Sequence, residues 1–305
     1  MMMKSEGFPY GFLIISTIKK GRKRMKKIGL IDYCLDQYHA NNYPNWIKEY
    51  SGGEMEVAYA WAMTDLPGRR TAEEWSKETG VPLCATAEEV IEKSDCLIVM
   101  SPDNPEFHEQ LCRLPFASGK LTYVDKTFAP DRETAVRLIE MAKAGNTPFF
   151  SSSAVRFALE YADLKGEEID TINSRGPGFD TYLIHQLEPV ISLMGPDVKK
   201  IMFVGTKDTP SLVLRFGDGR VATITQLGWE CDFSLAVNYK GDHAVVLQGA
   251  TDFYPRFLKE VVGFFNDGIP RVKPEETLQI MTILDYSKRA AATPDTWVEL
   301  PDLSC

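Results

Sequence analysis

In residues 25–150, short apolar runs alternate with stretches that have helical spacing of apolar positions. The apolar, β-prone runs that predict strands are 27–31, 56–63, 95–101, 121–125 and 149–150. The stretches that predict helices are 71–79, 87–93, 105–114, 132–143 and a connecting helix over 151–161. Alternating strands and helices predict an α/β domain over 25–150, a Rossmann-type doubly wound parallel sheet.

From residue 151 onward the pattern changes to a series of strands flanked by helices. The predicted strands are 169–173, 198–204, 211–216, 221–227, 234–239 and 244–248, with an edge strand at 297–300. The predicted helices are 180–194, 254–266 and 274–291. The Asp218-Gly219 pair predicts a hairpin turn between two of the strands. This order predicts that 151–305 form an α+β domain with a broad, mostly antiparallel sheet.

Residues 1–24 belong to neither predicted domain. Their apolar run at 11–15 precedes a Lys/Arg cluster at 19–27, whereas a secretory signal has the basic residues first. The run is also too short to cross a bilayer. We expect an N-terminal extension that is either disordered or the product of a misassigned start, with translation beginning at Met25.

Composition narrows the classes of partner. The chain of 305 residues has a formal net charge of −9, which argues against nucleic acid and anionic membranes as partners. Its six cysteines have no CxxC spacing, which favours reduced thiols in a cytoplasmic protein. The four histidines and six cysteines show no spacing typical of metal ligands, so no metal site is expected.

The segment 119–130 contains the first candidate for chemistry. Asp125 and Lys126 directly follow the predicted strand at 121–124, and ligands of open α/β sheets bind beyond the carboxyl ends of the strands. Lys126 either points its ammonium into a cleft or is solvated and paired with Asp125. The segment alone favours the second interpretation.

The flanking residues favour the first interpretation, a Lys126 that points into a cleft, because several segments together resemble a known family. Three of these segments are Ser101-Pro102-Asp103-Asn104-Pro105-Glu106-Phe107-His108, Ala117-Ser118-Gly119-Lys120 and Asp125-Lys126-Thr127-Phe128-Ala129. They are similar to the TPNxxH … AGKHV-x-x-EKPLA run of the Gfo/Idh/MocA family. This family comprises glucose–fructose oxidoreductase, inositol dehydrogenase and relatives. The likeness continues through 151–157 and 274–278. It implies a catalytic Lys126, an NAD or NADP cofactor beside Ser101, Pro102 and Asp125, and a homodimer or homotetramer.

A second resemblance to the family covers 175–188, similar to its GG-x-x-x-D-x-G-x-H-x-x-D/E segment. It implies that His185 is the acid/base residue. Glu188 lies three residues later on the same helical face, where it could orient the His185 ring and raise its pKa. Asp180 precedes His185 by five residues where the family has four, so it is either a catalytic partner or a helix cap.

Other cleft residues follow less directly from the same likeness. His108 matches a cleft-facing histidine of the family, although a plain position on a helix face is an equal alternative. Arg156 and Tyr182 are candidates for lining the cleft, where a guanidinium and a hydroxyl suit a polyol or an acidic sugar.

The loop after the first strand departs from the family pattern. A Rossmann fold normally binds a diphosphate with G-x-G-x-x-G, but this chain has Asp32-Tyr33-Cys34-Leu35-Asp36-Gln37-Tyr38-His39-Ala40 and no glycine until Gly52. Two carboxylates there would repel a diphosphate unless His39 or a cation offsets them. Trp61 occupies the place near the end of the second predicted strand where this fold usually has an acidic residue, and Asp65 follows four residues later. The candidate cofactor residues of these loops are Asp32, Tyr33, Cys34, His39, Trp61 and Asp65.

Two hypotheses of function follow. The first is an NAD(P)-dependent oxidoreductase that acts on a hydroxyl or carbonyl of a sugar, an inositol or a related small molecule. The alternative is a cofactor-deficient relative that binds a small molecule or serves in an assembly. The missing glycines favour the alternative, whereas Lys126 and His185 favour the oxidoreductase.

Overall fold

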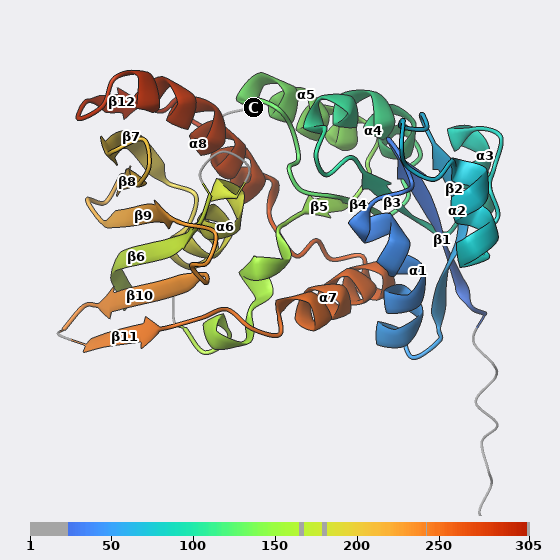
Figure 1. Cartoon of the computed structure of the whole chain (residues 1–305), viewed down its shortest axis with the longest axis horizontal. Helices are drawn as coiled ribbons and strands as arrows, with labels where there is room; N and C mark the ends of the chain where they lie inside the picture. Colours follow the sequence, from blue (N-terminus) through green and yellow to red (C-terminus); the bar gives the residue numbers. More distant parts are fainter. Residues whose placement is uncertain (1–23, 165–167, 179–181, 242, 304–305) are drawn as a thin grey trace, which may run out of the picture.

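A computed structural model describes residues 24–164, 168–178, 182–241 and 243–303 (Figure 1). The N-terminal segment 1–23 and Asp180 lie outside these ranges. Among the described residues, no helix combines the length and the apolar character that crossing a membrane requires.

The first sheet is fully parallel, as the alternation of strands and helices predicted. Its strand order is β2-β1-β3-β4-β5. The strand β3 is buried along its whole length, as expected when helices cover both faces of a parallel sheet. Its strands are β1 (Lys26–Asp32), β2 (Met55–Ala62), β3 (Cys96–Met100), β4 (Thr122–Val124) and β5 (Phe149–Ser151).

Helices connect these strands and begin at side-chain caps in several cases. Thr71 forms a capping box with Glu74, and Asp131 accepts a hydrogen bond from the Thr134 N–H at 2.7 Å. The segment 151–161 is not one helix, because it forms only two short 3₁₀ turns, Ala154–Phe157 and Leu159–Tyr161. The helices are α1 (Tyr38–Tyr50), α2 (Ala72–Thr79), α3 (Ala87–Lys93), α4 (His108–Ala117, after a 3₁₀ turn at Pro105–Phe107) and α5 (Arg132–Ala144).

The second sheet is mostly antiparallel, which confirms the predicted class. Its order is β11-β10-β6-β9-β8-β7-β12, and β6 and β9 form its parallel pair. Buried and partly exposed positions alternate along β8 and β9, so one face of the sheet is covered. The strands are β6 (Ile169–Pro177), β7 (Val198–Gly205), β8 (Pro210–Phe216), β9 (Val221–Leu227), β10 (Ser234–Tyr239), β11 (His243–Leu247) and the edge strand β12 (Trp297–Glu299).

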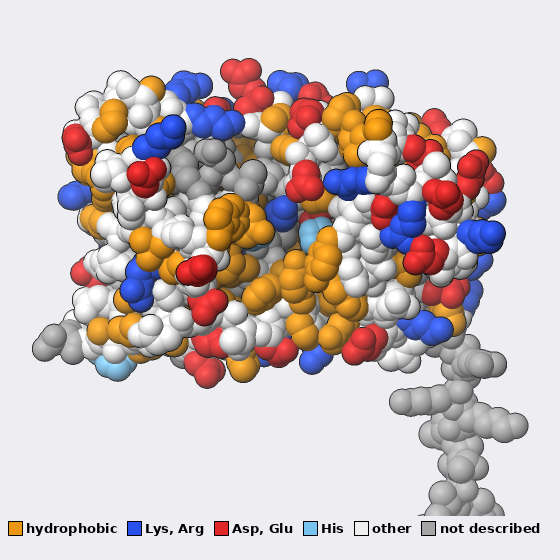
Figure 2. All heavy atoms as spheres, viewed as in Figure 1, with side chains coloured by type: hydrophobic (Ala, Val, Ile, Leu, Met, Phe, Trp, Pro, Cys, Tyr) orange, Lys and Arg blue, Asp and Glu red, His pale blue; other side chains and the backbone are white. Residues whose placement is uncertain are grey.

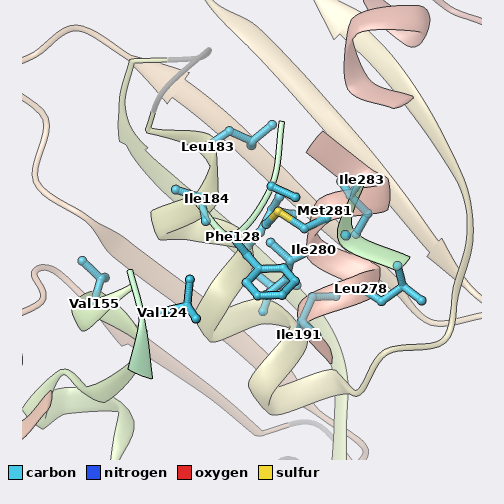
Figure 3. Close-up of a cluster of buried hydrophobic side chains, with 14 of the residues drawn as sticks. Val124, Phe128, Val155, Leu183, Ile184, Ile191, Leu278, Ile280, Met281 and Ile283 are labelled. Atoms are coloured by element: carbon cyan, nitrogen blue, oxygen red, sulfur yellow. The ribbon is translucent and has the colours of Figure 1, made fainter. Parts of the chain in front are cut away.

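Two helices, α6 (Leu183–Met194) and α8 (Pro274–Ala292), join the two halves of the chain. Figure 3 shows Phe128, from the loop after β4, among Ile191, Ile280 and Leu278 of these helices. All four side chains belong to one buried cluster that extends from the first sheet to the second. The loop that carries Lys126 is therefore packed directly against the second half.

The helix α7 (Phe253–Asp267) follows the second sheet in sequence but packs beside α1 on the first sheet (Figure 1). Phe264 is fully buried, and its ring meets that of Phe150 of β5 edge-on at 5.2 Å. Phe257 packs in the same way against Tyr123 of β4 at 5.4 Å. The chain thus returns to the first sheet and places the start of α7 beside the start of α1.

We expect Phe264→Ala to lower the free energy of unfolding by about 3–5 kcal/mol, because it removes a fully buried ring and leaves a cavity. Equilibrium unfolding in urea measures the change. Ile269→Ala is the matched control, since Ile269 is 62% exposed just after the same helix, and it should change stability by less than about 0.5 kcal/mol. Equal unfolding midpoints for the two variants would contradict the assigned packing of α7.

Candidate active site

A cleft of about 950 Å³ lies beyond the carboxyl ends of β1, β3 and β4, where the second half of the chain packs against the first sheet. The strand order reverses between β1 and β3, and ligands of open α/β sheets bind at such a switch point. Figure 2 shows the hollow between the two halves, with a histidine side chain in pale blue inside it. Lining residues include Gln37, Tyr38, His39, Arg69, Pro102 and Lys126 from the first half, and Tyr182, His185, Tyr254 and Lys288 from the second.

Lys126 and His185 come from the two halves of the chain and line the same cleft, as well as an adjoining cavity of about 180 Å³. The Lys126 N–H donates to Asp125 Oδ1 at 2.8 Å, which fixes the backbone at this point. Its ammonium has no hydrogen bond or ion pair with any residue that the structure describes. The alternative in which the Lys126 ammonium pairs with Asp125 is therefore wrong, because the Asp125 carboxylate binds the Lys126 N–H and the His39 ring instead.

The Asp125 carboxylate binds His39, which lies on α1. Asp125 Oδ2 and His39 Nδ1 are 2.9 Å apart, and the two side chains are 2% and 13% exposed. Burial opposes ionisation of Asp125, but the His39 ring and the charge of Lys126 outweigh it and lower the Asp125 pKa overall. An ionised carboxylate therefore lies beneath the cleft and holds the His39 ring.

The His185 ring is oriented by a serine and by aromatic rings. Its Nδ1 lies 2.6 Å from Ser153 Oγ, and the rings of Tyr182 and Phe233 meet it edge-on at 4.9 and 5.6 Å. Burial and the nearby charges of Lys126 and His39 lower the pKa of His185 to about 3. The expectation that Glu188 raises this pKa is wrong, since His185 stays neutral.

Glu188 instead belongs to a buried ion-pair network with Arg156. Its carboxylate accepts a hydrogen bond from the Ser153 N–H at 3.0 Å and pairs with Arg156 at 3.1 Å. Arg156 also pairs with Glu276 of α8. Burial raises the pKa of Glu188, although Arg156 acts in the opposite direction. Arg156 and Glu188 therefore tie α6 and α8 to the segment after β5, and neither lines the 950 Å³ cleft.

His108 is buried beneath the Lys126 loop and does not face the cleft. It is fully buried, and its Nδ1–H donates to the carbonyl oxygens of Thr127 and Phe128 at 3.0 and 3.1 Å. Burial lowers its pKa. The cleft-lining alternative is therefore wrong, and His108 helps to hold the loop that carries Lys126.

The remaining predicted cofactor residues occupy varied places. Ser101 is buried and donates to the Asn104 carbonyl at 2.7 Å, which shapes the turn after β3 and places Pro102 in the cleft. Asp65 accepts a hydrogen bond from the Ala72 N–H at the start of α2. Four further candidates do not line the cleft: Tyr33, Cys34, Trp61 and Asp65. The Tyr33 ring stacks on Phe107 at 4.2 Å. Cys34 is buried, and Trp61 packs against the core.

The loop between β1 and α1 carries no uncompensated negative charge toward the cleft. The Asp32 carboxyl is fully buried and accepts hydrogen bonds from Gln37 Nε2 at 2.7 and 2.9 Å, and burial raises its pKa well above the usual range. Asp36 is ionised but neutralised, because Arg70 pairs with it at 2.6 Å and lowers its pKa to about 2. The predicted repulsion of a diphosphate is therefore removed within the loop.

The start of α1 offers donors for an anion. The helix begins at Tyr38 without a side-chain cap, and Gln37, Tyr38 and His39 line the cleft. The first-turn N–H groups of a helix have no intrahelical partner and attract negative charge. Arg69 lines the same cleft. These residues fit the diphosphate of a dinucleotide although the loop lacks glycine.

Several residues that line or support the cleft were missed from the sequence. Ser153 stands in the Ser151-Ser152-Ser153 run of the family-like segment, which was a usable signal. Tyr254 of α7 and Lys288 of α8 carried no motif. Asp180, a candidate catalytic partner, lies outside the described residues.

No family model matches the chain, and no curated protein matches it in sequence. Solved structures do match. Myo-inositol 2-dehydrogenase from Lactobacillus plantarum superposes with a TM-score of 0.71 at 15% identity, over 91% of this chain and 100% of that chain. The chain has the fold of an inositol dehydrogenase.

Two further structures have the same fold. Scyllo-inositol dehydrogenase from Lactobacillus casei matches with a TM-score of 0.70 at 14% identity, over 91% of this chain and 98% of that chain. GenD2 from gentamicin A biosynthesis, in complex with NAD, matches with a TM-score of 0.70 at 14% identity, over 93% and 99% of the two chains. This is the two-part architecture that the resemblance to the Gfo/Idh/MocA family implied.

We expect Arg156→Met to lower the free energy of unfolding by about 3–5 kcal/mol, because it leaves the buried carboxylate of Glu188 and the partly buried carboxylate of Glu276 without their cation. Thermal and urea unfolding measure the loss. Arg137→Met is the control, since Arg137 pairs with Glu109 while half exposed, and such a pair contributes less than about 1 kcal/mol. A loss of unfolding free energy for Arg156→Met no larger than that for Arg137→Met would rule out the network.

Stability should fall as pH decreases from 6.5 toward 3, in part because of His185. The unfolded ring binds a proton below its ordinary pKa of 6.5, whereas the folded ring stays neutral until pH falls to about 3. One such group contributes at most about 1.4 kcal/mol per pH unit. His185→Asn should therefore show a shallower loss of unfolding free energy between pH 7 and 4.5 than the wild type. His243→Asn, at an exposed position, should keep the wild-type slope; identical slopes for all three proteins would refute the buried neutral state.

Proposed function

We propose that the protein is an NAD(P)-dependent oxidoreductase that acts on a hydroxyl or carbonyl of a sugar, an inositol or a related polyol. The observation that carries this proposal is the convergence of Lys126 and His185, from the two halves of the chain, on one cleft at the switch point of a parallel sheet. The fold shared with inositol dehydrogenases supports it.

The cofactor would lie along the first-half wall of the cleft. The N-terminal turn of α1 and Arg69 would hold its diphosphate, and Pro102 would form part of the adjoining wall. When bound, the dinucleotide supplies the hydride acceptor or donor of the reaction. The volume of about 950 Å³ is at the upper end of the ~300–1,000 Å³ range of small-molecule sites.

The protein's own residues would bind and polarise the substrate. The Lys126 ammonium has no partner among the described residues, so it is available to bind the substrate oxygen and to stabilise negative charge that develops on it. His185 would hydrogen-bond the same oxygen as a neutral ring. Tyr182 and Tyr254 line the cleft as well, and their hydroxyl groups would bind further hydroxyls of a polyol.

One observation favours the cofactor-deficient alternative. Side chains fill the β1–α1 loop where a dinucleotide fold usually has glycine, and Cys34 and Leu35 are 4% and 1% exposed. A diphosphate could then approach only the end of α1 and not the loop backbone. Binding of the cofactor decides between the two hypotheses.

Titration of NADH and NADPH fluorescence should show binding of at least one nucleotide below millimolar concentration, because the charges of the β1–α1 loop are compensated and α1 is uncapped. Lys126→Met should bind the same nucleotide but lower kcat by about 10²–10³-fold, since it removes the ammonium from the substrate oxygen. Turnover is measured with NAD⁺ or NADP⁺ and myo-inositol, scyllo-inositol and glucose.

Lys240→Met serves as the control, because Lys240 is exposed beyond β10 and away from the cleft. It should keep wild-type binding and turnover. If the wild type binds neither nucleotide at millimolar concentration, the oxidoreductase proposal fails and the alternative takes its place.

A further inference from the structure

The cleft contains a second imidazole, His39, that no sequence motif assigned to proton transfer. It lies in the first turn of α1 and lines both the 950 Å³ cleft and the adjoining cavity that contain Lys126 and His185. His185 lines the same adjoining cavity of about 180 Å³, so the two rings share one small space. Both therefore face the place where the substrate oxygen would bind beside Lys126.

The partner of His39 determines which ring nitrogen carries the proton. Because the Asp125 pKa is lowered, this carboxylate is ionised and can only accept hydrogen bonds. The bond of 2.9 Å therefore runs from His39 Nδ1–H to Asp125 Oδ2. In the neutral ring Nε2 then carries a lone pair, and it has no hydrogen-bond partner among the described residues. A carboxylate that orients a histidine in this way also stabilises the imidazolium that forms when Nε2 takes a proton.

His185 is poorly suited to the same task. With a pKa of about 3, its ring is a weak base at neutral pH, and proton transfer is most effective when the pKa lies near the working pH. The two largest causes of this low pKa are burial and the charge of Lys126, and both persist when His39 is neutral. His39 has a buried carboxylate as its partner, whereas His185 has the neutral hydroxyl of Ser153.

The groups that surround His39 come from every element packed against it. Its own helix contributes Tyr43, whose ring stacks at 5.8 Å, and Tyr38, while α7 contributes Tyr254 at 6.4 Å. Tyrosine hydroxyls stay neutral at physiological pH, and burial raises the pKa of Tyr254 to about 12. Among the residues that the structure describes, the titratable or charged groups that share the cavity with His39 are therefore Asp125 and Lys126 at the end of β4, His185 on α6, and tyrosines.

We propose that His39, held by Asp125, exchanges the proton of the substrate hydroxyl, while His185 contacts the same oxygen as a neutral hydrogen-bonding group. This inference rests on the proposed oxidoreductase function. In the direction of oxidation, the O–H bond breaks and its proton passes to His39 Nε2. The electron pair of that bond forms the second C–O bond, and the hydrogen of the carbinol carbon leaves with its electron pair to the nicotinamide dinucleotide. Asp125 is a positioning residue for His39.

The first test needs neither cofactor nor substrate. The chain has four histidines, so the full-length protein labelled with ¹⁵N-histidine gives a tractable NMR spectrum, in which His39→Asn identifies the His39 signals. We expect neutral His39 to carry its proton on Nδ1, and His185 to stay neutral from pH 8 to pH 5. In Asp125→Asn the amide donates to Nδ1, so the proton of neutral His39 should move to Nε2. A wild-type His39 with its proton on Nε2, or a His185 that becomes charged within this range, overturns the proposal.

The second test separates chemistry from folding. Asparagine at position 39 keeps a donor for Asp125 Oδ2 but has no group in place of Nε2. His39→Asn should therefore keep the wild-type thermal midpoint and, because it retains the backbone N–H groups of the first turn of α1, still bind NADH, while kcat at saturating nucleotide falls by about 10²–10⁴-fold. His243→Asn is the control, since His243 is exposed on β11. A kcat for His39→Asn within threefold of wild type overturns the proposal.

The two ways of failing are distinguishable. Absence of NADH and NADPH binding removes the proposed function, and with it the hydride step. An NADH-binding enzyme with the opposite His39 tautomer, or with full activity in His39→Asn, removes only the role of His39.

Discussion

A buried negative charge at the carboxyl end of β4 fixes the arrangement of the cleft. Asp125 is 2% exposed, and an isolated carboxylate at that depth would be strongly destabilising. Two contacts stabilise it, the Lys126 N–H at one oxygen and the His39 ring at the other. The first orients the backbone of Lys126, and the second ties α1 to β4. The positions of Lys126 and His39 therefore both follow from the hydrogen bonds that the Asp125 carboxylate requires.

The second half of the cleft depends on a different buried charge. Arg156 is 7% exposed and needs the carboxylates of Glu188 and Glu276 to compensate it. Glu188 lies one turn after His185 on α6, so the network also fixes the depth and rotation of the helix that presents His185. Ser153 links the two systems, because its N–H binds Glu188 while its hydroxyl binds the His185 ring. The half of the site that contains His185 is thus positioned by an ion-pair network that does not line the 950 Å³ cleft.

Much of the fold could be predicted from the sequence, because its signals are local. The apolar runs of β3 and β9 and the caps of α2 and α5 depend on neighbouring residues alone. The helix α1 was missed because it is rich in aromatic and polar residues and contains Pro44. Its buried face consists of Ala40, Tyr43 and Ile47, an amphipathic stripe too weak to stand out against its composition.

The site was only partly predictable, because its decisive contacts join residues far apart in the chain. Lys126 and His185 were identified through family-like motifs, and both line the cleft. His39 and Asp125 are 86 positions apart, and no spacing rule connects them. The pairing of His185 with Glu188 was a sound inference from helical geometry. In the structure, however, the Glu188 carboxylate pairs with the buried Arg156 instead. Spacing shows which residues share a face, whereas burial decides which of them bind each other.

The glycine-free loop shows how charge compensation can alter the meaning of a missing motif. Glycines in a dinucleotide loop serve close approach of the backbone, and their absence removes that approach. Their absence does not remove the attraction of the N-terminus of α1 for an anion, provided that the negative charges of the loop's own carboxyl groups are compensated. Burial raises the pKa of Asp32, which accepts hydrogen bonds from Gln37, and Arg70 pairs with Asp36. The same loop brings His39 to the first turn of α1, where it lines the cleft together with Lys126 and His185. The residues that replace the motif thus keep the loop compatible with an anion and add an ionisable ring to the cleft.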